Sequence, residues 1–377
     1  MNILSPVAAP VTPIAAAPAI LAAAWQLLSH LERGKPVDAA ILRAAMEAAF
    51  GASDAAGAWD WKAAYEACEV ATVLFLRKYG CALFRKAGSP TSRLSALAKI
   101  TDLLPTHTRR SEESQAFQQF STPLPLGFAA LAAAGITPDD VVLEPSAGTG
   151  LMAILAQTAG STLVLNELAE TRADLLSSLF PASPVTRFDA AQIDDHLDPA
   201  AVPSVVLMNP PFSAMANVTG RMADAAYRHI ASALARLTEG GRLVTITGAN
   251  FGPDHPDWRE AFVRLQQRGR VVFTTAIDGA VYAKHGTSFP TRLTVIDKRP
   301  ADDPSLSGLA GHRARCRDAA RLDRSSRATA FAFLPAGRIG VTSDCDAQDR
   351  ARLSRALGGS TPDCRHCCRS QGHRTQL

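Results

Sequence analysis

Charged residues are missing from the start of this sequence: positions 2–29 contain no Lys, Arg, Asp or Glu. A signal peptide or a membrane span is compatible with such a stretch. However, the stretch has no basic flank, is rich in alanine rather than leucine, and is interrupted by prolines at positions 6, 10, 13 and 18. We therefore expect a flexible Pro/Ala-rich segment over residues 1–21, a helix beginning near Ala22, and no membrane partner.

Cysteine is scarce before position 300, where only Cys68 and Cys81 occur, and the total of seven is odd. This pattern argues against a disulfide framework and favours a reducing, cytoplasmic location. Positive and negative residues are also nearly balanced, because the net charge is only +4 over 377 residues. Such a value is compatible with an anionic partner but is not typical of a protein that coats DNA.

Lysine and glutamate are both absent from residues 301–377, which contain thirteen arginines and eight aspartates. Neither helical nor strand periodicity is sustained there, so we expect residues 300–377 to form an irregular Arg-rich tail, disordered or replaced relative to its ancestor. A metal site is the alternative, but a single C-x2-C pair is a weak zinc pattern and we expect no metal. The residues concerned are Cys364, His366, Cys367, Cys368 and His373.

Helical periodicity dominates residues 22–104, where apolar residues recur every three to four positions. This spacing predicts a small all-helical domain, with Trp25, Trp59 and Trp61 as core anchors rather than base-stacking residues. Gly80 follows "LRKY" and is the predicted end of one helix. The polar, turn-prone residues 105–117 are the expected linker to a second domain.

Short runs rich in Val and Leu alternate with helical patterns over residues 118–299. Because continuous apolar strands that alternate with helices are typical of a parallel sheet covered on both faces, we predict an α/β doubly wound fold. The expected strands lie at 141–145, 162–167, 204–209, 242–248, 270–276 and 292–298.

The loop "EPSAGTG" at 144–150 follows the first of these strands and precedes a helix. Its glycines, Gly148 and Gly150, permit a tight turn that brings the backbone and a helix N-terminus close to a ligand. With Ala153 they also match the dinucleotide fingerprint, with Glu167 in place to bind ribose hydroxyls, so an NAD-binding protein stays open. No Gly-Lys-Ser/Thr follows, which excludes a P-loop.

The turn "NPPF" at 209–212 ends the apolar run 204–208. Two prolines remove backbone donors and hold Asn209 in extended geometry. A doubly wound strand order places 205–208 beside 141–143, so this turn is expected to face the glycine loop across one crevice. A dehydrogenase has no evident use for such a turn, and its loop more usually begins with glycine than with Glu144 and Pro145.

These motifs occur in an order that resembles the S-adenosylmethionine-dependent amino-methyltransferases, and more closely the DNA adenine-N6 methyltransferases. The resemblance covers residues 118–298 and rests on "QQFSTPLPLG", "EPSAGTG", "NEL", "FDA", "NPPF" and "GTSFPTRLTV". It implies a seven-stranded Rossmann-like methyltransferase sheet, S-adenosylmethionine as cofactor, and a flipped-out adenine of DNA as substrate.

The resemblance also implies roles for individual residues. The segment that covers the methionine end of the cofactor is Phe120, Ser121 and Thr122. The loop that contacts the cofactor through its backbone contains Glu144, Pro145, Ala147, Gly148 and Gly150. Glu167 is the acid that binds the ribose, and Asp189 is the acid that binds the adenine. Catalysis falls to the turn Asn209, Pro210, Pro211 and Phe212, in which Asn209 and the Pro210 carbonyl accept hydrogen bonds from the target amine. Phe212 would stack on the target ring, with Phe289 as a second aromatic contact. Lys284 and His285 are interpreted as polar loop residues.

A helical region followed by this kind of domain resembles the amino-terminal part of plasmid and phage methylase-helicase proteins. In those proteins a strawberry-notch-like helicase follows, whereas here the Arg-rich tail does, so a separate helicase component is an implied partner. Two alternatives stay open. The first is methylation of guanine N2 in RNA or of a protein glutamine, since those families share the Asn-Pro-Pro motif. The second is a non-catalytic module that binds cofactor or nucleic acid.

Overall fold

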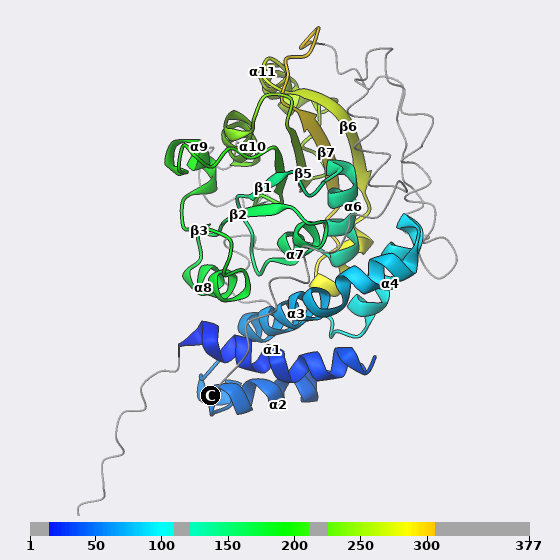
Figure 1. Cartoon of the computed structure of the whole chain (residues 1–377), viewed down its shortest axis with the longest axis vertical. Helices are drawn as coiled ribbons and strands as arrows, with labels where there is room; N and C mark the ends of the chain where they lie inside the picture. Colours follow the sequence, from blue (N-terminus) through cyan, green and yellow to red (C-terminus); the bar gives the residue numbers. More distant parts are fainter. Residues whose placement is uncertain (1–14, 109–120, 212–224, 306–377) are drawn as a thin grey trace, which may run out of the picture.

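A computed structural model of the chain describes residues 15–108, 121–211 and 225–305. Phe120, Phe212 and almost all of the Arg-rich tail, with its Cys/His group, lie outside the described residues. The first part of the chain is helical, as predicted, and forms the lower layer of the molecule (Figure 1). Its elements are α1 (Ala16–Glu32), α2 (Ala39–Phe50), η1 (Asp54–Ala56), α3 (Trp61–Ala87) and α4 (Pro90–Asp102).

Three details of this helical region differ from the sequence-based expectation. Helix α1 begins at Ala16, six residues before the expected start at Ala22. Helix α3 continues through Gly80 to Ala87. Gly80 serves a close approach of helices rather than a helix end, since a Cβ there would lie 3.3 Å from Oγ1 of Thr158 in α7. Trp25 is 56% exposed and anchors no core, whereas Trp59 is buried as predicted.

The second part contains a seven-stranded sheet of order β3-β2-β1-β4-β5-β7-β6, which confirms the predicted fold class. The sheet is not wholly parallel, because β7 runs antiparallel to both β5 and β6. Strand β3 has two residues and was not among the predicted apolar runs. The strands are β1 (Val141–Glu144), β2 (Thr162–Asn166), β3 (Val185–Thr186), β4 (Val205–Met208), β5 (Arg242–Gly248), β6 (Arg270–Ile277) and β7 (Thr291–Asp297).

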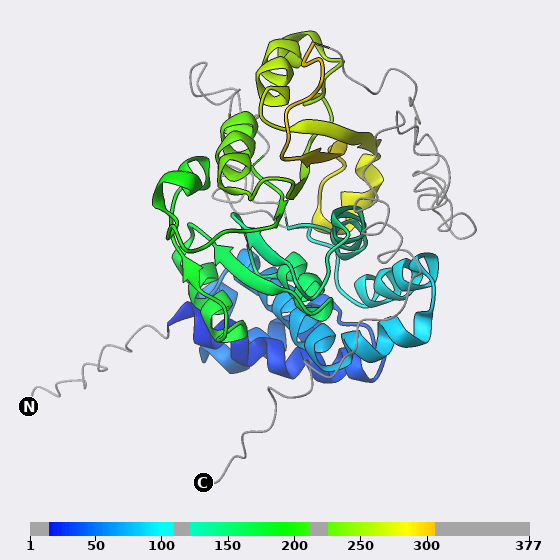
Figure 2. The ribbon, with the colours of Figure 1, turned by 45° about the horizontal axis from the view of Figure 1, so that its top comes forward.

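Helices cover both faces of the sheet (Figure 2). Alternate residues of β4 enter two separate apolar clusters: Val205 and Leu207 face one, Val206 and Met208 the other. The first cluster includes α6 (Leu124–Ala134), α7 (Leu151–Thr158) and α8 (Glu170–Leu179), and the second includes α9 (Ile193–His196), α10 (Ala225–Arg236) and α11 (Arg259–Gln266). Three 3-10 helices complete the described elements: η2 (Ala190–Gln192), η3 (Pro256–Trp258) and η4 (Gly279–His285).

The helical region packs directly on the sheet region. Helix α3 contacts α7, α1 contacts α8, and buried side chains of both regions form one continuous apolar cluster. The division into domains stays a prediction, but the two parts share a core. None of the described helices combines the length and the apolar character needed to cross a membrane.

A buried ion pair fixes the antiparallel strand β7 against β5. Arg242 and Asp297 are partners in the strand register, and the guanidinium Nε and Nη2 donate to the two carboxylate oxygens at 2.7 and 3.1 Å. Both side chains are about 5% exposed. Removal of one partner would leave a buried charge without compensation.

We expect Arg242→Met to lower the free energy of unfolding by about 3–5 kcal/mol, because Asp297 would stay buried without its cation. Urea denaturation measures the change. Arg264→Ala is the control, since its pair with Glu260 is long and exposed and contributes about 0.3–0.5 kcal/mol. Similar small losses in both variants would contradict the importance of the buried pair.

Candidate active site

A pocket of about 150 Å³ lies at the carboxyl ends of β1, β2 and β4. Strands β1 and β4 are adjacent and parallel, so the glycine loop and the Asn-Pro-Pro turn meet there as the sequence predicts. The predicted residues that line the pocket are Ser121, Thr122, Glu144, Pro145, Ala147, Gly148, Glu167, Asp189, Asn209, Pro210 and Pro211. Gly150 and Phe289 do not line it, and Phe289 is 41% exposed.

Glycine occupies the two positions of the loop for different physical reasons. Both have positive φ, 56° at Gly148 and 90° at Gly150. A Cβ on Gly150 would lie 2.6 Å from the Phe180 ring, so this glycine permits the loop to pack against the end of α8. A Cβ on Gly148 would meet nothing within 4 Å. Gly148 therefore leaves open space on the side of the pocket.

Asn166, at the end of β2, holds the loops on either side of it and has no role predicted from the sequence. Its Nδ2 donates to the carbonyl oxygens of Pro145 and Phe188 at 2.8 and 2.9 Å. Its Oδ1 accepts from the Phe188 N–H and the Thr186 hydroxyl, each at 2.8 Å. The amide thereby fixes the glycine loop relative to β3. The sequence signals for it are its place as a polar residue at the end of the apolar run "TLVLN" and as the first residue of the motif "NEL".

Glu167 follows directly and is also buried. Its two carboxylate oxygens accept hydrogen bonds from the N–H groups of Gly148 and Ala169, at 2.8 and 3.0 Å. The carboxylate is thus held rigidly against the glycine loop, where the sequence places a ribose ligand. Asp189 also lines the pocket and is exposed, and its Oδ1 accepts from the Ala191 N–H at 2.9 Å.

His229 of α10 is a pocket residue that no sequence pattern indicated. Burial lowers the pKa of its imidazole, while Asp189 opposes that shift. Its Nδ1 has no hydrogen-bond partner among the described residues. His229 therefore contributes a buried imidazole with one unpartnered nitrogen to the lining of the pocket.

Glu144, at the end of β1, is the most strongly perturbed acid of the pocket. It is 2% exposed, and its Oε2 finds no hydrogen-bond partner within the described part of the chain. Burial, followed by the neighbouring Glu167 carboxylate, raises the pKa of Glu144 well above its ordinary 4.5, although the N–H of Ala153 opposes the rise. A cation bound next to Glu144 would relieve this cost.

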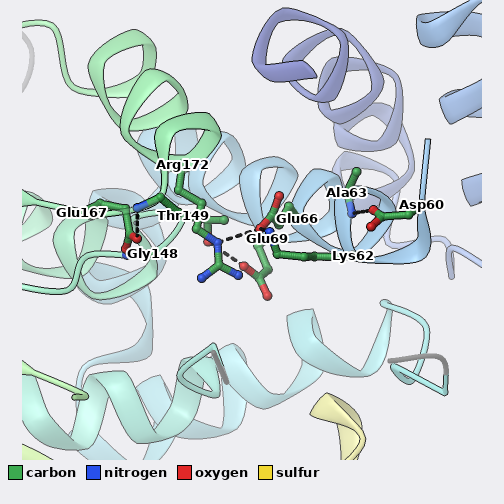
Figure 3. A network of polar contacts seen from close by, with 10 residues as sticks. Asp60, Lys62, Ala63, Glu66, Glu69, Gly148, Thr149, Glu167 and Arg172 are labelled. Atoms are coloured by element: carbon green, nitrogen blue, oxygen red, sulfur yellow. Dashed lines mark hydrogen bonds and ion pairs between the residues drawn. The ribbon is translucent and has the colours of Figure 1, made fainter. Parts of the chain in front are cut away.

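Helix α3 of the helical region supports the same loops through buried polar contacts (Figure 3). The Thr149 hydroxyl donates to Glu69 at 2.6 Å, and Arg172 Nε donates to Glu66 at 2.6 Å. Lys62 lies 3.6 Å from the same Glu66 oxygen. These partners are 80 and 106 residues apart in sequence, so no local pattern could have indicated them.

The Asn-Pro-Pro turn is held by two other segments. Asn209 Nδ2 donates to the Thr122 hydroxyl at 3.0 Å. Tyr282 of η4 is fully buried, and burial raises the pKa of its hydroxyl, while the neighbouring Asn209 side chain opposes the rise. Thr122 thus holds the Asn209 amide, and Tyr282 lies beside it. Tyr282 was not identified from the sequence.

We expect Glu144→Gln to stabilise the protein increasingly as the pH rises above about 4.5. The raised pKa means that folding favours the protonated acid, so the contribution of Glu144 is full at low pH and is lost as the pH rises through its folded pKa. The loss amounts to about 1.4 kcal/mol for each pH unit that separates the folded pKa from the unfolded one. Urea unfolding from about pH 5 to about pH 9 measures the difference between variant and wild type. Glu239→Gln, at an exposed carboxylate, is the control. A difference that is independent of pH would contradict the raised pKa.

Comparison with known proteins gives structural likeness but no sequence family. No family model matches the chain, and no curated protein matches it.

Three solved structures illustrate the likeness. TrmN from Thermus thermophilus is 20% identical with a TM-score of 0.37, and the match covers 50% of this chain and 52% of TrmN, about half its length. A type I restriction-modification methyltransferase subunit from Streptococcus thermophilus is 16% identical with a TM-score of 0.39, over 54% of this chain and 50% of that one. Geranyl diphosphate C-methyltransferase from Streptomyces coelicolor is 17% identical with a TM-score of 0.34, over 46% and 75%. The fold class of this chain rests on its own strand order.

Proposed function

We propose that this protein transfers a methyl group from S-adenosylmethionine to the N6 amine of an adenine in DNA. The observation that carries the proposal is the position of Asn209 and Pro210 in the same pocket as the glycine loop, across the β1–β4 switch point. The Asn209 amide is held by its hydrogen bond to the Thr122 hydroxyl rather than left to rotate.

The residues of the pocket fit this cofactor, which supplies a methyl group activated on a positively charged sulfonium. Glu144 carries a buried oxygen without a partner among the described residues, and Glu167 holds a second buried carboxyl beside the loop. A cationic ligand beside Glu144 would favour the ionised form of this buried acid. The open side of Gly148 leaves room for a ligand against the backbone.

Within this proposal the acids have separate tasks. Glu167 would accept from the ribose hydroxyls and Asp189 from the adenine amino group of the cofactor. Ser121 and Thr122 line the pocket near Asn209, in place to cover the methionine end. Both acids already accept a backbone N–H, so their carboxylates are fixed before the ligand arrives.

The chemistry of the amine explains the turn. The lone pair of an exocyclic amine is delocalised into the ring, which makes the amine a poor nucleophile. Hydrogen bonds from its two N–H groups to Asn209 Oδ1 and the Pro210 carbonyl would favour a tetrahedral nitrogen with a directed lone pair. As the N–C bond forms and the C–S bond breaks, positive charge develops on that nitrogen. The same two fixed dipoles stabilise this charge until a proton is lost to solvent.

The positioning of the two reactants in one pocket also contributes to the rate of methyl transfer. Two reactants held at fixed distance and angle gain on the order of 7–11 kcal/mol at most, provided that the contact geometry is right. A base stacked in a duplex cannot reach a pocket at the ends of strands, so the adenine must be flipped out. The "FSTPLPLG" segment, whose Thr122 contacts Asn209, favours DNA over RNA or protein as the substrate.

We expect Asn209→Ala to lower methyl transfer by about 100-fold or more, because one fixed acceptor for the developing charge is lost. Labelled S-adenosylmethionine incubated with separate DNA, RNA and protein pools measures the rate, and mapping of N6-methyladenine identifies the product. Asn250→Ala, at an exposed position, is the control.

Other outcomes distinguish the alternatives. Label found only in RNA or only in protein would replace adenine by guanine N2 or glutamine as the target. Equal incorporation by wild type and Asn209→Ala would indicate a non-catalytic module. Binding of NADH in a titration, without binding of S-adenosylmethionine, would overturn the cofactor.

We expect Tyr282→Phe to lower kcat about 5- to 10-fold with little change in cofactor affinity, since the buried hydroxyl next to the Asn209 side chain is lost and a polar contact of this kind has a net value of about 1–1.5 kcal/mol. Single-turnover kinetics and calorimetric titration separate the two quantities. Tyr79→Phe is the matched control, because that hydroxyl contacts Glu32 far from the pocket. An unchanged kcat would show that Tyr282 does not position the Asn209 amide.

A further inference from the structure

Two histidines and a glutamate meet behind the glycine loop, in a group that the proposed reaction does not use. Glu69 belongs to α3, His107 to the segment after α4, and His285 is the last residue of η4. One potential ligand atom from each lies within 4.8 Å of the other two. Three segments that are far apart in the sequence thus contribute one group each.

The surrounding contacts hold both imidazoles in place. The His107 ring stacks on Tyr65 with centroids 4.0 Å apart and an angle of 13° between the planes, and lies 5.0 Å from the His285 ring. The His107 backbone N–H donates to the Lys284 carbonyl at 2.8 Å. A Cβ on Gly286 would collide with the His107 carbonyl, so this glycine permits the close approach of the two segments.

The polar atoms of the cluster are incompletely used. His285 Nδ1 is buried and has no hydrogen-bond partner in residues 15–108, 121–211 and 225–305. Glu69 accepts from the Thr149 hydroxyl through Oε2 at 2.6 Å. A cavity of about 30 Å³ lies among Glu69, His107 and His285, large enough for one ion or water.

We propose that Glu69, His107 and His285 bind a divalent transition-metal ion of the Zn²⁺ class. Imidazole nitrogen and carboxylate oxygen are ordinary zinc ligands, and three protein ligands leave one position for water. At ligand distances of about 2.0–2.2 Å, tetrahedral geometry places the ligand atoms about 3.3–3.6 Å apart. Small side-chain rotations would bring the three groups to these separations.

Neighbouring charges are compatible with this site. Lys284 also lines the cavity, but its ammonium donates to the Leu104 carbonyl at 3.0 Å. Cys68 is buried beside Glu69 and lies outside the cluster. The Thr149 hydroxyl acts as an outer-shell partner that orients the Glu69 carboxylate, as such partners do at metal sites.

The metal site would join the helical region to the sheet region next to the glycine loop and η4. Glu69 holds Thr149 of the glycine loop, and η4 carries Tyr282 three residues before His285. A metal ion there would fasten α3, the segment after α4 and η4 to one another. Metal binding itself does not depend on the proposed methyl transfer.

The test uses the full chain, stripped with chelator and reloaded with Zn²⁺, then measured by elemental analysis and thermal unfolding. We expect His285→Gln, His107→Gln and Glu69→Gln each to lower the zinc affinity at least about 100-fold and to abolish the rise in Tm on zinc addition. Equal Tm values of wild type and variants in chelator would show that the variants fold. His30→Gln is the matched control and is expected to bind like wild type.

Cysteines of the tail are competing zinc ligands. A second variant and a spectroscopic readout therefore separate zinc binding by these cysteines from binding by the proposed site. With Co²⁺, a His₂Glu site gives visible d–d absorption without the near-ultraviolet band of thiolate ligation. The double variant Cys364→Ser, Cys367→Ser should keep that spectrum. Absence of uptake by wild type, undiminished binding by the three site variants, or a thiolate band lost only in the cysteine variant would each overturn the site.

Discussion

The pocket depends on polar contacts that cross from one helix of the amino-terminal region to the loops of the sheet. Helix α3 presents Glu66 to Arg172 and Glu69 to Thr149, and all four side chains are buried. Buried charges are tolerated only with partners, so each contact constrains both sides. The glycine loop and the start of α8 therefore keep their places only while α3 lies beneath them. The helical region is part of the site rather than an appendage.

This arrangement gives the pocket a defined electrostatic character. Glu144 and Glu167 lie close enough for one carboxylate to raise the pKa of the other, and Arg172 stands behind them. A positive charge beside Glu144 would offset the cost of ionising this buried acid. His229 and the exposed Asp189 add polar groups to the lining.

Sequence patterns predicted the parts of the fold and site that are encoded locally. Apolar runs located the long strands, and the glycine loop and Asn-Pro-Pro turn were placed at one crevice because parallel neighbours share an edge. Strand direction has no such signature, so the antiparallel β7 could not be read from periodicity, and β3 was too short to be seen. Asn166, Tyr282 and the α3 acids were missed because their partners are distant in sequence. Phe289 has the right motif but lies outside the pocket.

The Asn166 amide sets a limit on how this chain can vary. Its side chain donates twice and accepts twice within four bonds of 2.8–2.9 Å, so every polar atom is used. Aspartate has the same shape but no donor, leucine offers neither, and glutamine is longer by one carbon. No other side chain of that size meets the same demand. A substitution of Asn166 would therefore alter the two loops that its amide holds, although the side chain itself is fully buried.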